Sequence, residues 1–256
     1  VVQEHLGATL PRPLLAEVRE ASGGNPFYAL EIVRMLQRTE TAVEAGHPLP
    51  LPESLHDLVH SRLLALPSES RQFLLAASAH AHPTLAVTER ASGVPCDQGL
   101  PPALEARIVA LDGERIRFTH PLLAAGAYET TDPLRRTEVH ARLAELLERP
   151  EARAWQLAAS VDEPDEDVAA VLEEAARGVR SLGAPRPAAL LLDRARELTP
   201  ADRREDAVRR AVEAAWLHFE SGDSRRAEAQ LRDVIAPLEP GPPRAPAAVV
   251  LARSTL

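Results

Sequence analysis

The sequence contains no lysine, and all 29 of its basic residues are arginines. A P-loop needs a lysine that reaches the β- and γ-phosphates, and no Gly-x-x-x-x-Gly-Lys-Ser/Thr motif is present. Schiff-base chemistry is excluded for the same reason, because it requires a lysine amine. We therefore expect no nucleotide hydrolysis by these 256 residues alone.

Cysteines, aromatic residues and long apolar runs are also scarce. Cys96 is the single cysteine, so no disulfide and no cysteine-based zinc site can form within the chain, which suits a reducing cytoplasm. No apolar run reaches the ~18 residues that span a bilayer, and the first residues lack a signal-peptide pattern. We expect a cytoplasmic protein without a membrane segment. Because the sequence opens without methionine and closes within a helical pattern, we expect both ends to lie inside a longer protein.

Acidic residues outnumber basic ones, which gives a formal net charge of −9 and a pI of about 5.5. Such a chain is a poor general ligand of nucleic acid or of an anionic membrane. Alanine and leucine, which favour helices, dominate the periodic segments, and most of the 23 prolines separate these segments. The sequence therefore predicts a mostly α protein built from many short helices.

Composition and helical spacing divide the chain into three predicted units, which cover residues 1–46, 47–132 and 133–256. In the first unit, a helix over 13–21 stops at a Ser-Gly-Gly sequence. A second helix then begins at Pro26, with Asn25 as its cap. The first unit is thus a pair of short helices.

The second unit combines short helices with a β-hairpin. Leucines at helical spacing predict one helix before Pro67 and another after it, and shorter helices are predicted over 84–91 and 102–108. An apolar run, an Asp-Gly turn at 112–113 and an alternating strand predict a short hairpin. This order of elements is typical of a winged helix.

Most winged helices bind DNA, but the charge of this unit argues against that function. Residues 53–129 hold six arginines and nine acidic residues, a balance of −3. The hairpin carries Arg115 and Arg117 beside Asp112 and Glu114, whereas a DNA-reading wing normally presents net positive charge. We interpret the hairpin as a protein-packing element, and a DNA-binding repressor is the weaker alternative.

The third unit matches the tetratricopeptide pattern twice. Each match has a glycine at the helix turn, small residues five and twelve positions later, and a proline near the end: Gly183, Ala188, Ala195 and Pro200, then Gly222, Ala227, Val234 and Pro240. Small residues are needed where two helices cross closely. The glycines are 39 residues apart (222 − 183), against about 34 in the standard repeat, so we predict a helical array with longer hairpins.

Two positions are candidates for contact with a nucleotide. Gly24, Asn25 and Pro26 either only stop one helix and start the next, or also place a base against Pro26. His120 lies where the hairpin gives way to a helix. It either caps a helix, or donates to an anion that the helix N–H groups already favour. We predict no catalytic residue, because no nucleophile or acid–base set is evident.

Two histidine pairs have spacings that could suit a metal. His56 and His60 lie four residues apart on one helical face, but no third ligand is evident nearby. His80 and His82 bracket a predicted loop. We interpret both pairs as surface residues and predict no metal site.

Several motifs in this order and spacing resemble the large ATP-binding LuxR-type regulators, which belong to the STAND class of signal-transduction ATPases. The motifs are SGGNPFYALE at 22–31, LPESL at 51–55, RFTHPLL at 117–123, HARLAE at 140–145 and LTP at 198–200. In that family a P-loop ATPase domain precedes a helical lid, and a winged helix follows the lid. A helical arm then senses an inducer or a partner, and a C-terminal helix-turn-helix binds DNA.

The resemblance implies roles for individual residues. With Gly24 and Asn25 before it, Pro26 takes the position of the family's Gly-x-Pro proline, which packs on adenine. His120 takes the position of the histidine that contacts the phosphate of bound ADP and holds the off state. Gly126 departs from the family, which tends to place a larger residue there.

We therefore expect residues 1–46 to be a lid, 47–132 a winged helix, and 133–256 the start of a tetratricopeptide-like α-solenoid arm. The implied cofactor is ATP or ADP, bound in the complete protein. The implied partners are a P-loop domain and a DNA-binding domain outside this sequence, and an unidentified inducer or protein on the arm. Whether the complete protein is a slow ATPase or only binds ATP stays open. The alternative is a helical-repeat interaction scaffold, in which both motifs are only helix caps.

Overall fold

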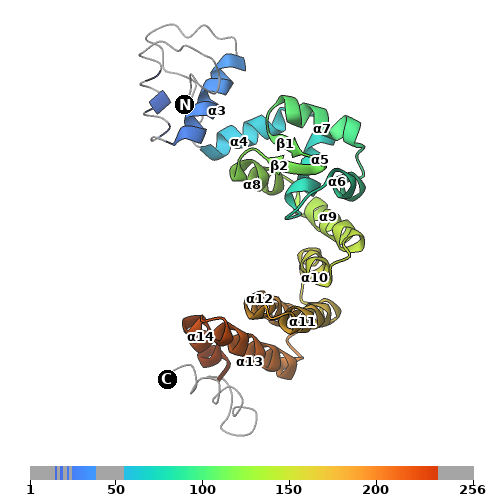
Figure 1. The fold of residues 1–256 in the computed structure, drawn as a ribbon, viewed down its shortest axis with the longest axis vertical. Helices are drawn as coiled ribbons and strands as arrows, with labels where there is room; N and C mark the ends of the chain where they lie inside the picture. The colour runs from blue at the N-terminus through green and yellow to red at the C-terminus, as the bar shows by residue number, and fades with distance from the viewer. Residues whose placement is uncertain (1–14, 16–17, 20–21, 23–24, 39–54, 236–256) are drawn as a thin grey trace.

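The computed structural model describes residues 15, 18–19, 22, 25–38 and 55–235. Within this part of the chain there are twelve α-helices and one two-stranded antiparallel sheet, which confirms a mostly α protein. The described residues form a crescent, with α3 near one end and α14 near the other (Figure 1). Between these ends lie a central body and a descending series of helices, which we call the arm.

The first described helix, α3 (Pro26–Arg38), begins as the sequence predicts. The side-chain Oδ1 of Asn25 accepts hydrogen bonds from the backbone N–H groups of Phe27 and Tyr28, at 3.0 and 3.2 Å. Pro26 occupies the first helical position, where its missing N–H costs nothing. The helix expected over 13–21 lies mostly outside the described residues.

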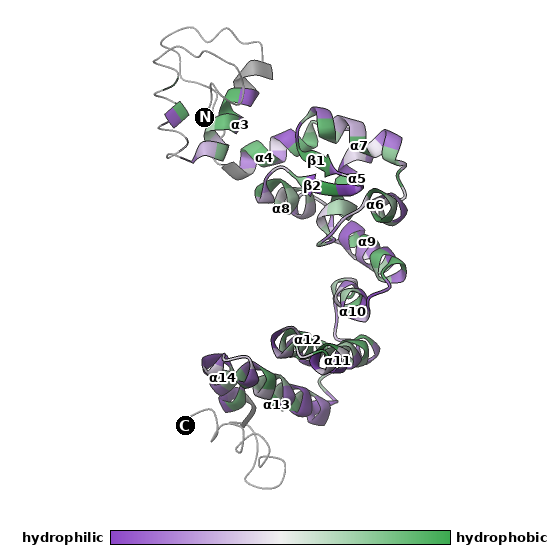
Figure 2. Ribbon diagram, viewed as in Figure 1, coloured by the Kyte–Doolittle hydropathy of each residue, from purple (hydrophilic) through white to green (hydrophobic). Residues whose placement is uncertain are grey.

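The central body (residues 55–129) surrounds one apolar core. Its elements, in chain order, are α4 (Leu55–Leu64), α5 (Ser68–Ser78), α6 (Leu85–Ser92), α7 (Cys96–Glu105), β1 (Val109–Asp112), β2 (Arg115–Phe118) and α8 (Pro121–Glu129). Phe73, Leu74, Ile108, Ile116 and Leu123 are almost fully buried in this core. Hydrophobic residues accordingly colour the centre of this body, whereas hydrophilic residues cover much of α13 and α14 (Figure 2).

The predicted hairpin is present, with a slightly different turn. Asp112 is the last residue of β1 and pairs with Arg115, so the two loop residues are Gly113 and Glu114. Gly113 has a φ of 61°, in the left-handed region that favours glycine. A third segment lies beside β2: the N–H of Ile116 donates to the Pro83 carbonyl at 2.9 Å.

The predicted bounds of the helix over 102–108 are wrong. The helix there is α7, which starts at Cys96 and ends at Glu105, and the chain is already approaching β1 at Ile108. Pro101 and Pro102 therefore lie inside the helix, despite the backbone bonds they remove. Gly99 explains the tolerance: a Cβ at this position would come within 2.7 Å of the Cβ of Phe73, so α7 packs unusually close to α5. Tertiary packing outweighs the local signal of the two prolines.

The arm consists of α9 (Pro133–Leu146), α10 (Pro150–Ala159), α11 (Glu166–Ser181), α12 (Pro185–Glu197), α13 (Arg204–Glu220) and α14 (Ser224–Ile235). Each arm helix packs on the next one along the chain. Gly183 and Gly222 form the turns, with φ values of 77° and 86°. Ala188, Ala195 and Ala227 are fully buried, as close helix crossing requires. The side chain of Val234 and all of Pro240 lie outside the described residues.

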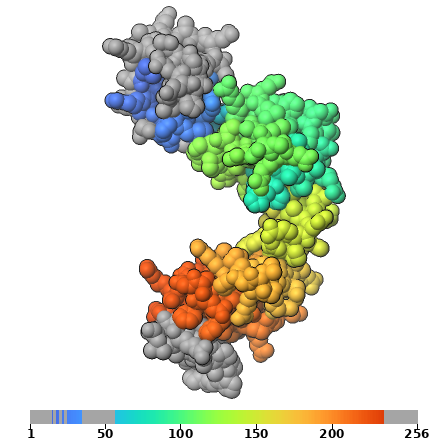
Figure 3. Space-filling model, viewed as in Figure 1, coloured from blue at the N-terminus to red at the C-terminus, as the bar shows by residue number. Residues whose placement is uncertain are grey.

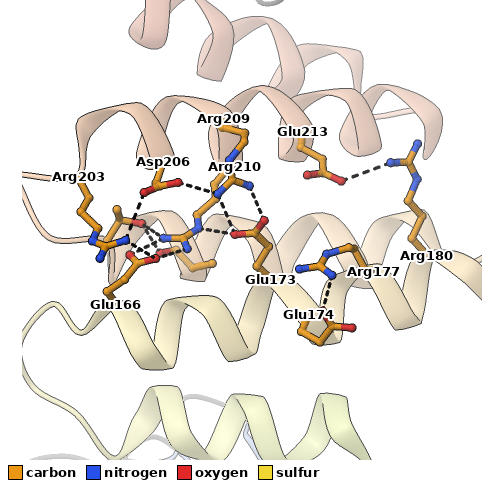
Figure 4. A network of polar contacts seen from close by, with 12 residues as sticks. Glu166, Glu173, Glu174, Arg177, Arg180, Arg203, Asp206, Arg209, Arg210 and Glu213 are labelled. Atoms are coloured by element: carbon orange, nitrogen blue, oxygen red, sulfur yellow. Dashed lines mark hydrogen bonds and ion pairs between the residues drawn. The ribbon is translucent and has the colours of Figure 1, made fainter.

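A buried arginine holds two arm helices together (Figure 4). Arg210 of α13 is 2% exposed, and its guanidinium donates to both carboxylate oxygens of Glu166 at 2.7 and 2.9 Å. Its Nε donates to Glu173 at 2.8 Å, and Nη1 donates to the Thr199 hydroxyl at 2.7 Å. Bidentate pairing of this kind fixes orientation as well as distance, so α13 is held in one register against α11.

A second polar cluster, centred on the buried residues Asp193 and His218, joins the last three arm helices. Asp193 of α12 accepts hydrogen bonds from Arg226 and Gln230 of α14, at 2.7 and 2.9 Å. Its Oδ2 also lies 2.9 Å from Nε2 of His218, which is 2% exposed on α13. One carboxylate therefore binds three side chains from two neighbouring helices.

Among the described helices, none combines the length and the apolar character needed to cross a membrane.

Candidate functional site

The start of α3 and the start of α8 meet through two stacked rings. The ring of Phe27 lies 3.7 Å from the imidazole of His120, centroid to centroid, and the two planes differ by 11°. Phe27 immediately follows Pro26, and it packs against the core of the central body. The structure therefore brings together the two regions that the sequence singles out, although they are far apart along the chain.

His120 is the cap residue of α8. Its backbone is extended, and its Nδ1 accepts a hydrogen bond from the backbone N–H of Leu122 at 3.2 Å. Since Nδ1 is the acceptor, a neutral ring carries its proton on Nε2. No acceptor for Nε2 occurs among the residues that the structure describes. The stacking on Phe27 thus sets the orientation of the imidazole plane, and the hydrogen bond from Leu122 sets its neutral tautomer. The Nε2–H group remains available as a donor.

The helix amides contribute less to an anion site than the sequence suggests. Pro121 has no N–H, the N–H of Leu122 donates to the ring of His120, and that of Leu123 donates to the His120 carbonyl at 3.0 Å. The first backbone donors of α8 are therefore already bonded. Any contact with an anion at this point depends on the imidazole.

The other candidate residues, Gly24, Asn25 and Pro26, lie near the start of α3 in the sequence. Asn25 is used as the cap of α3, whereas Pro26 is exposed at the first position of that helix. Gly24 lies outside the described residues. Phe27 is the residue that sequence reasoning missed, because nothing in a local pattern shows that a ring after Pro26 meets an imidazole so far along the chain.

A buried ion pair fixes α3 to the central body. Glu31 of α3 pairs with Arg62 of α4, and the two side chains are only 2% and 3% exposed. The Arg62 guanidinium also donates to the backbone carbonyls of Ala106 and Arg107, just beyond α7. One guanidinium therefore connects three segments: α3, α4 and the segment that follows α7. Glu31 lies within the motif at 22–31, but the sequence alone does not identify its partner.

Close packing of α8 on α4 requires a small residue at Gly126. A Cβ on Gly126 would come within 2.5 Å of Cγ1 of Val59. A cavity of about 250 Å³ lies beside this crossing, and its lining includes His60 and Leu122. Neither Pro26 nor His120 lines this cavity; Pro26 is exposed and His120 is half-buried.

The two histidine pairs and the single cysteine have the following surroundings. No cluster of three or more potential metal ligands occurs among the described residues, and the side chain of His56 lies outside them. Burial lowers the pKa of His80, and the nearby His82 lowers it further. Burial, with a contribution from Glu89, raises the pKa of the Cys96 thiol to about 11, which makes it a poor nucleophile at neutral pH.

No protein-family model, curated protein or solved structure matches this chain. The assignment of a function therefore depends on the sequence motifs and on the geometry around His120.

Proposed function

We propose that this chain is the regulatory part of an ATP-dependent transcriptional regulator of the STAND class. In this proposal residues 1–46 are the lid, 47–132 the winged helix, and 133–256 the start of a tetratricopeptide-like arm. The chain closes over ADP bound to a P-loop domain outside this sequence. Engagement of the arm by an inducer or protein biases the lid toward opening, and a further domain binds DNA.

The observation that carries the proposal is the stacking of Phe27 on His120. Phe27 directly follows Pro26, so the stacking brings the start of α3, which belongs to the first unit, against His120 of the second unit. This contact supports a nucleotide surface that the two units share. In the closed state, Pro26 packs on the base, and Nε2–H of His120 donates to a phosphate. Stacking and capping hold the imidazole ready, so little ordering entropy is lost when it binds. The switch is a two-state equilibrium shifted by these differential contacts.

The folds assigned to the two later units have separate support. In the central body, the segment around Pro83 lies beside β2, in the position of a third wing strand. In the arm, turn glycines and buried alanines recur at the positions that a tetratricopeptide-like hairpin needs.

The proposal is tested by the release of ADP from the protein that contains this sequence together with its P-loop domain. His120→Ala removes a hydrogen bond to a charged group, and we expect ADP to dissociate about 10- to 100-fold faster. Basal activation of transcription should rise accordingly. His82→Ala is the matched control, because His82 is an exposed histidine in the loop between α5 and α6. Equal ADP off-rates in wild type and His120→Ala would contradict the proposal.

The alternative function is a helical-repeat scaffold without a nucleotide role. One observation favours it: Asn25 and His120 both act as helix caps, which gives each a sufficient structural role. The genomic sequence upstream of Val1 separates the two functions. A Walker A motif within the preceding ~250 residues supports the switch, and its absence supports the scaffold.

A further inference from the structure

The joint between the central body and the arm contains a chain of buried hydrogen bonds. The Tyr128 hydroxyl at the end of α8 lies 2.8 Å from Nε2 of His140 on α9. Nδ1 of the same imidazole lies 2.5 Å from Oε1 of Gln156 on α10. Nε2 of Gln156 donates to the carbonyl of Ala79, just after α5, at 2.9 Å. This hydrogen-bond chain thus begins in the central body at Tyr128, passes through α9 and α10, and ends in the central body at Ala79.

The direction of every bond in this chain is determined by its last member. The carbonyl of Ala79 can only accept, so the amide nitrogen of Gln156 faces it and Oε1 faces His140. Oε1 can also only accept, so Nδ1 of His140 carries the proton. Nε2 of the neutral ring is then an acceptor, and the Tyr128 hydroxyl donates to it. All the groups are satisfied in one arrangement, which favours a single geometry of the joint.

Burial makes this chain energetically important. His140 is 6% exposed and Gln156 is 8% exposed, so loss of one partner leaves a polar group without water. Leu75 of α5 belongs to one buried apolar cluster with Val139 and Leu143 of α9, and the Arg136 guanidinium lies 5.1 Å from the centre of the Tyr128 ring. α9 and α10 also form the narrow part of the molecule between the central body and the rest of the arm (Figure 3).

The two ends of α8 contact different parts of the molecule, α3 at one end and the arm at the other. His120 caps its first turn and stacks on Phe27, whereas Tyr128 lies in its last turn and bonds the arm. A helix of nine residues is about 13 Å long and moves as a rigid rod. A displacement of α9 must therefore either break the bond to Tyr128 or move α8, and with it the imidazole of His120.

We infer that Tyr128, His140 and Gln156 are positioning residues that transmit the state of the arm to His120. A partner that draws α9 away from α8 either moves α8 through this hydrogen-bond chain, or breaks the chain and releases α8 from the position that the chain holds. In both cases the imidazole leaves its stacked position. This inference rests on the proposed function for the identity of the ligand at His120. The mechanical link itself concerns only α8 and the arm, and it is measurable without a nucleotide.

The test uses the 256-residue chain with ¹³C-labelled histidine and phenylalanine side chains, observed by NMR. Tyr128→Phe removes the hydroxyl and keeps the ring, and Gln156→Met removes both amide bonds with little change of volume. We expect the amides of α9 and α10 to exchange about 5- to 30-fold faster in either variant. We also expect the ring signals of His120 and Phe27 to move, which a purely local role of Tyr128 or Gln156 in the joint would not cause.

Thr137→Ala is the matched control, since it removes a hydroxyl on α9 that only bonds the Leu134 carbonyl within the same helix. It should leave the His120 signals in place. The double variant Tyr128→Phe/Gln156→Met should move them no further than either single variant, because both changes break one chain. Two single variants keep the test open if one of them fails to fold.

Two results would overturn the inference. One is faster exchange in α9 and α10 while His120 and Phe27 keep their wild-type signals. The other is unchanged exchange in the arm, which would mean that the chain does not hold the joint. Failure of the proposed function is a separate result, because it appears as unchanged ADP release in His120→Ala, whatever the Tyr128 variant does.

Discussion

The central body has two boundaries, and they are built from different chemistry. At the boundary with α3, the buried polar contact is an ion pair between Glu31 and Arg62. At the boundary with α9, it is a chain of neutral groups set among apolar side chains. Removing one partner of a buried ion pair costs about 3–5 kcal/mol, whereas removing one partner of a buried neutral hydrogen bond costs about 1–3 kcal/mol. We therefore expect single substitutions to weaken the first boundary more than the second.

The largest effect is expected from breaking the first boundary. Arg62→Ala leaves the carboxylate of Glu31 buried without its main partner, and the carbonyls of Ala106 and Arg107 lose a donor. We expect the free energy of unfolding to fall by about 3–5 kcal/mol, measured by urea denaturation.

Arg34→Ala is the control for this variant. Arg34 also pairs with Glu31, but it is 20% exposed, so its loss should cost no more than ~1 kcal/mol. The double variant Glu31→Leu/Arg62→Met should recover most of the stability, because no charge is then left buried. If Arg62→Ala costs no more than Arg34→Ala, the two boundaries do not differ as we describe.

The same comparison shows which features a sequence can predict. The caps at Asn25 and His120, the hairpin around Gly113 and the helix turn at Gly183 follow from residues within a few positions of one another. Local geometry determines them, and the sequence identifies them. The predicted helix over 102–108 differs from α7 because packing against Phe73, which is distant in sequence, outweighs the tendency of Pro101 and Pro102 to end a helix.

Neither boundary was predictable in the same way. The pairing of Glu31 with Arg62 and the chain from Tyr128 to Gln156 join residues whose types are common on helices. Most acidic residues that the structure describes are exposed, and the sequence contains no signal that distinguishes the buried Glu31 from them. Partner choice between distant helices depends on packing, which a single sequence does not reveal.

An intermediate effect is expected at Gly126, which lies on the helix shared by both boundaries. In Gly126→Ala the new Cβ would come within 2.5 Å of Cγ1 of Val59 and 3.0 Å of Cδ1 of Leu63, so either these side chains or α8 must shift. We expect a loss of about 1–3 kcal/mol in the free energy of unfolding. In a helix without such contacts, Gly→Ala normally stabilises.

Gly178 provides the matched control in the arm. It lies within α11, and a Cβ there would meet nothing within 4 Å. Gly178→Ala should therefore stabilise the protein by up to ~1 kcal/mol, through helix propensity alone. Opposite signs at Gly126 and Gly178 would confirm that close packing, and not backbone freedom, requires the glycine in α8. Equal signs would contradict this explanation.

The smallest effect, and the one that most directly distinguishes the boundaries, is expected from pH. Burial lowers the pKa of His140 below its ordinary value of 6.5; the hydrogen bond to Gln156 opposes this with a smaller effect, and the nearby Arg136 adds a still smaller lowering effect. The unfolded chain therefore binds a proton at a higher pH than the folded one. The contribution of His140 to stability is complete above pH 6.5 and declines as the pH falls from 6.5 toward the lower folded pKa.

This decline should concern the arm boundary and not the α3 boundary. The α3 boundary also contains an imidazole, because His120 stacks on Phe27. In a His120→Gln background the amides of α3 should keep their protection between about pH 7.5 and 5.5, after correction for intrinsic exchange. The amides of α9 and α10 should lose protection over the same interval. Because burial also lowers the pKa of His80, the contribution of His140 is measured as the difference between wild type and His140→Gln. If that difference is independent of pH, the imidazole is not the titrating group, and the second boundary yields for another reason.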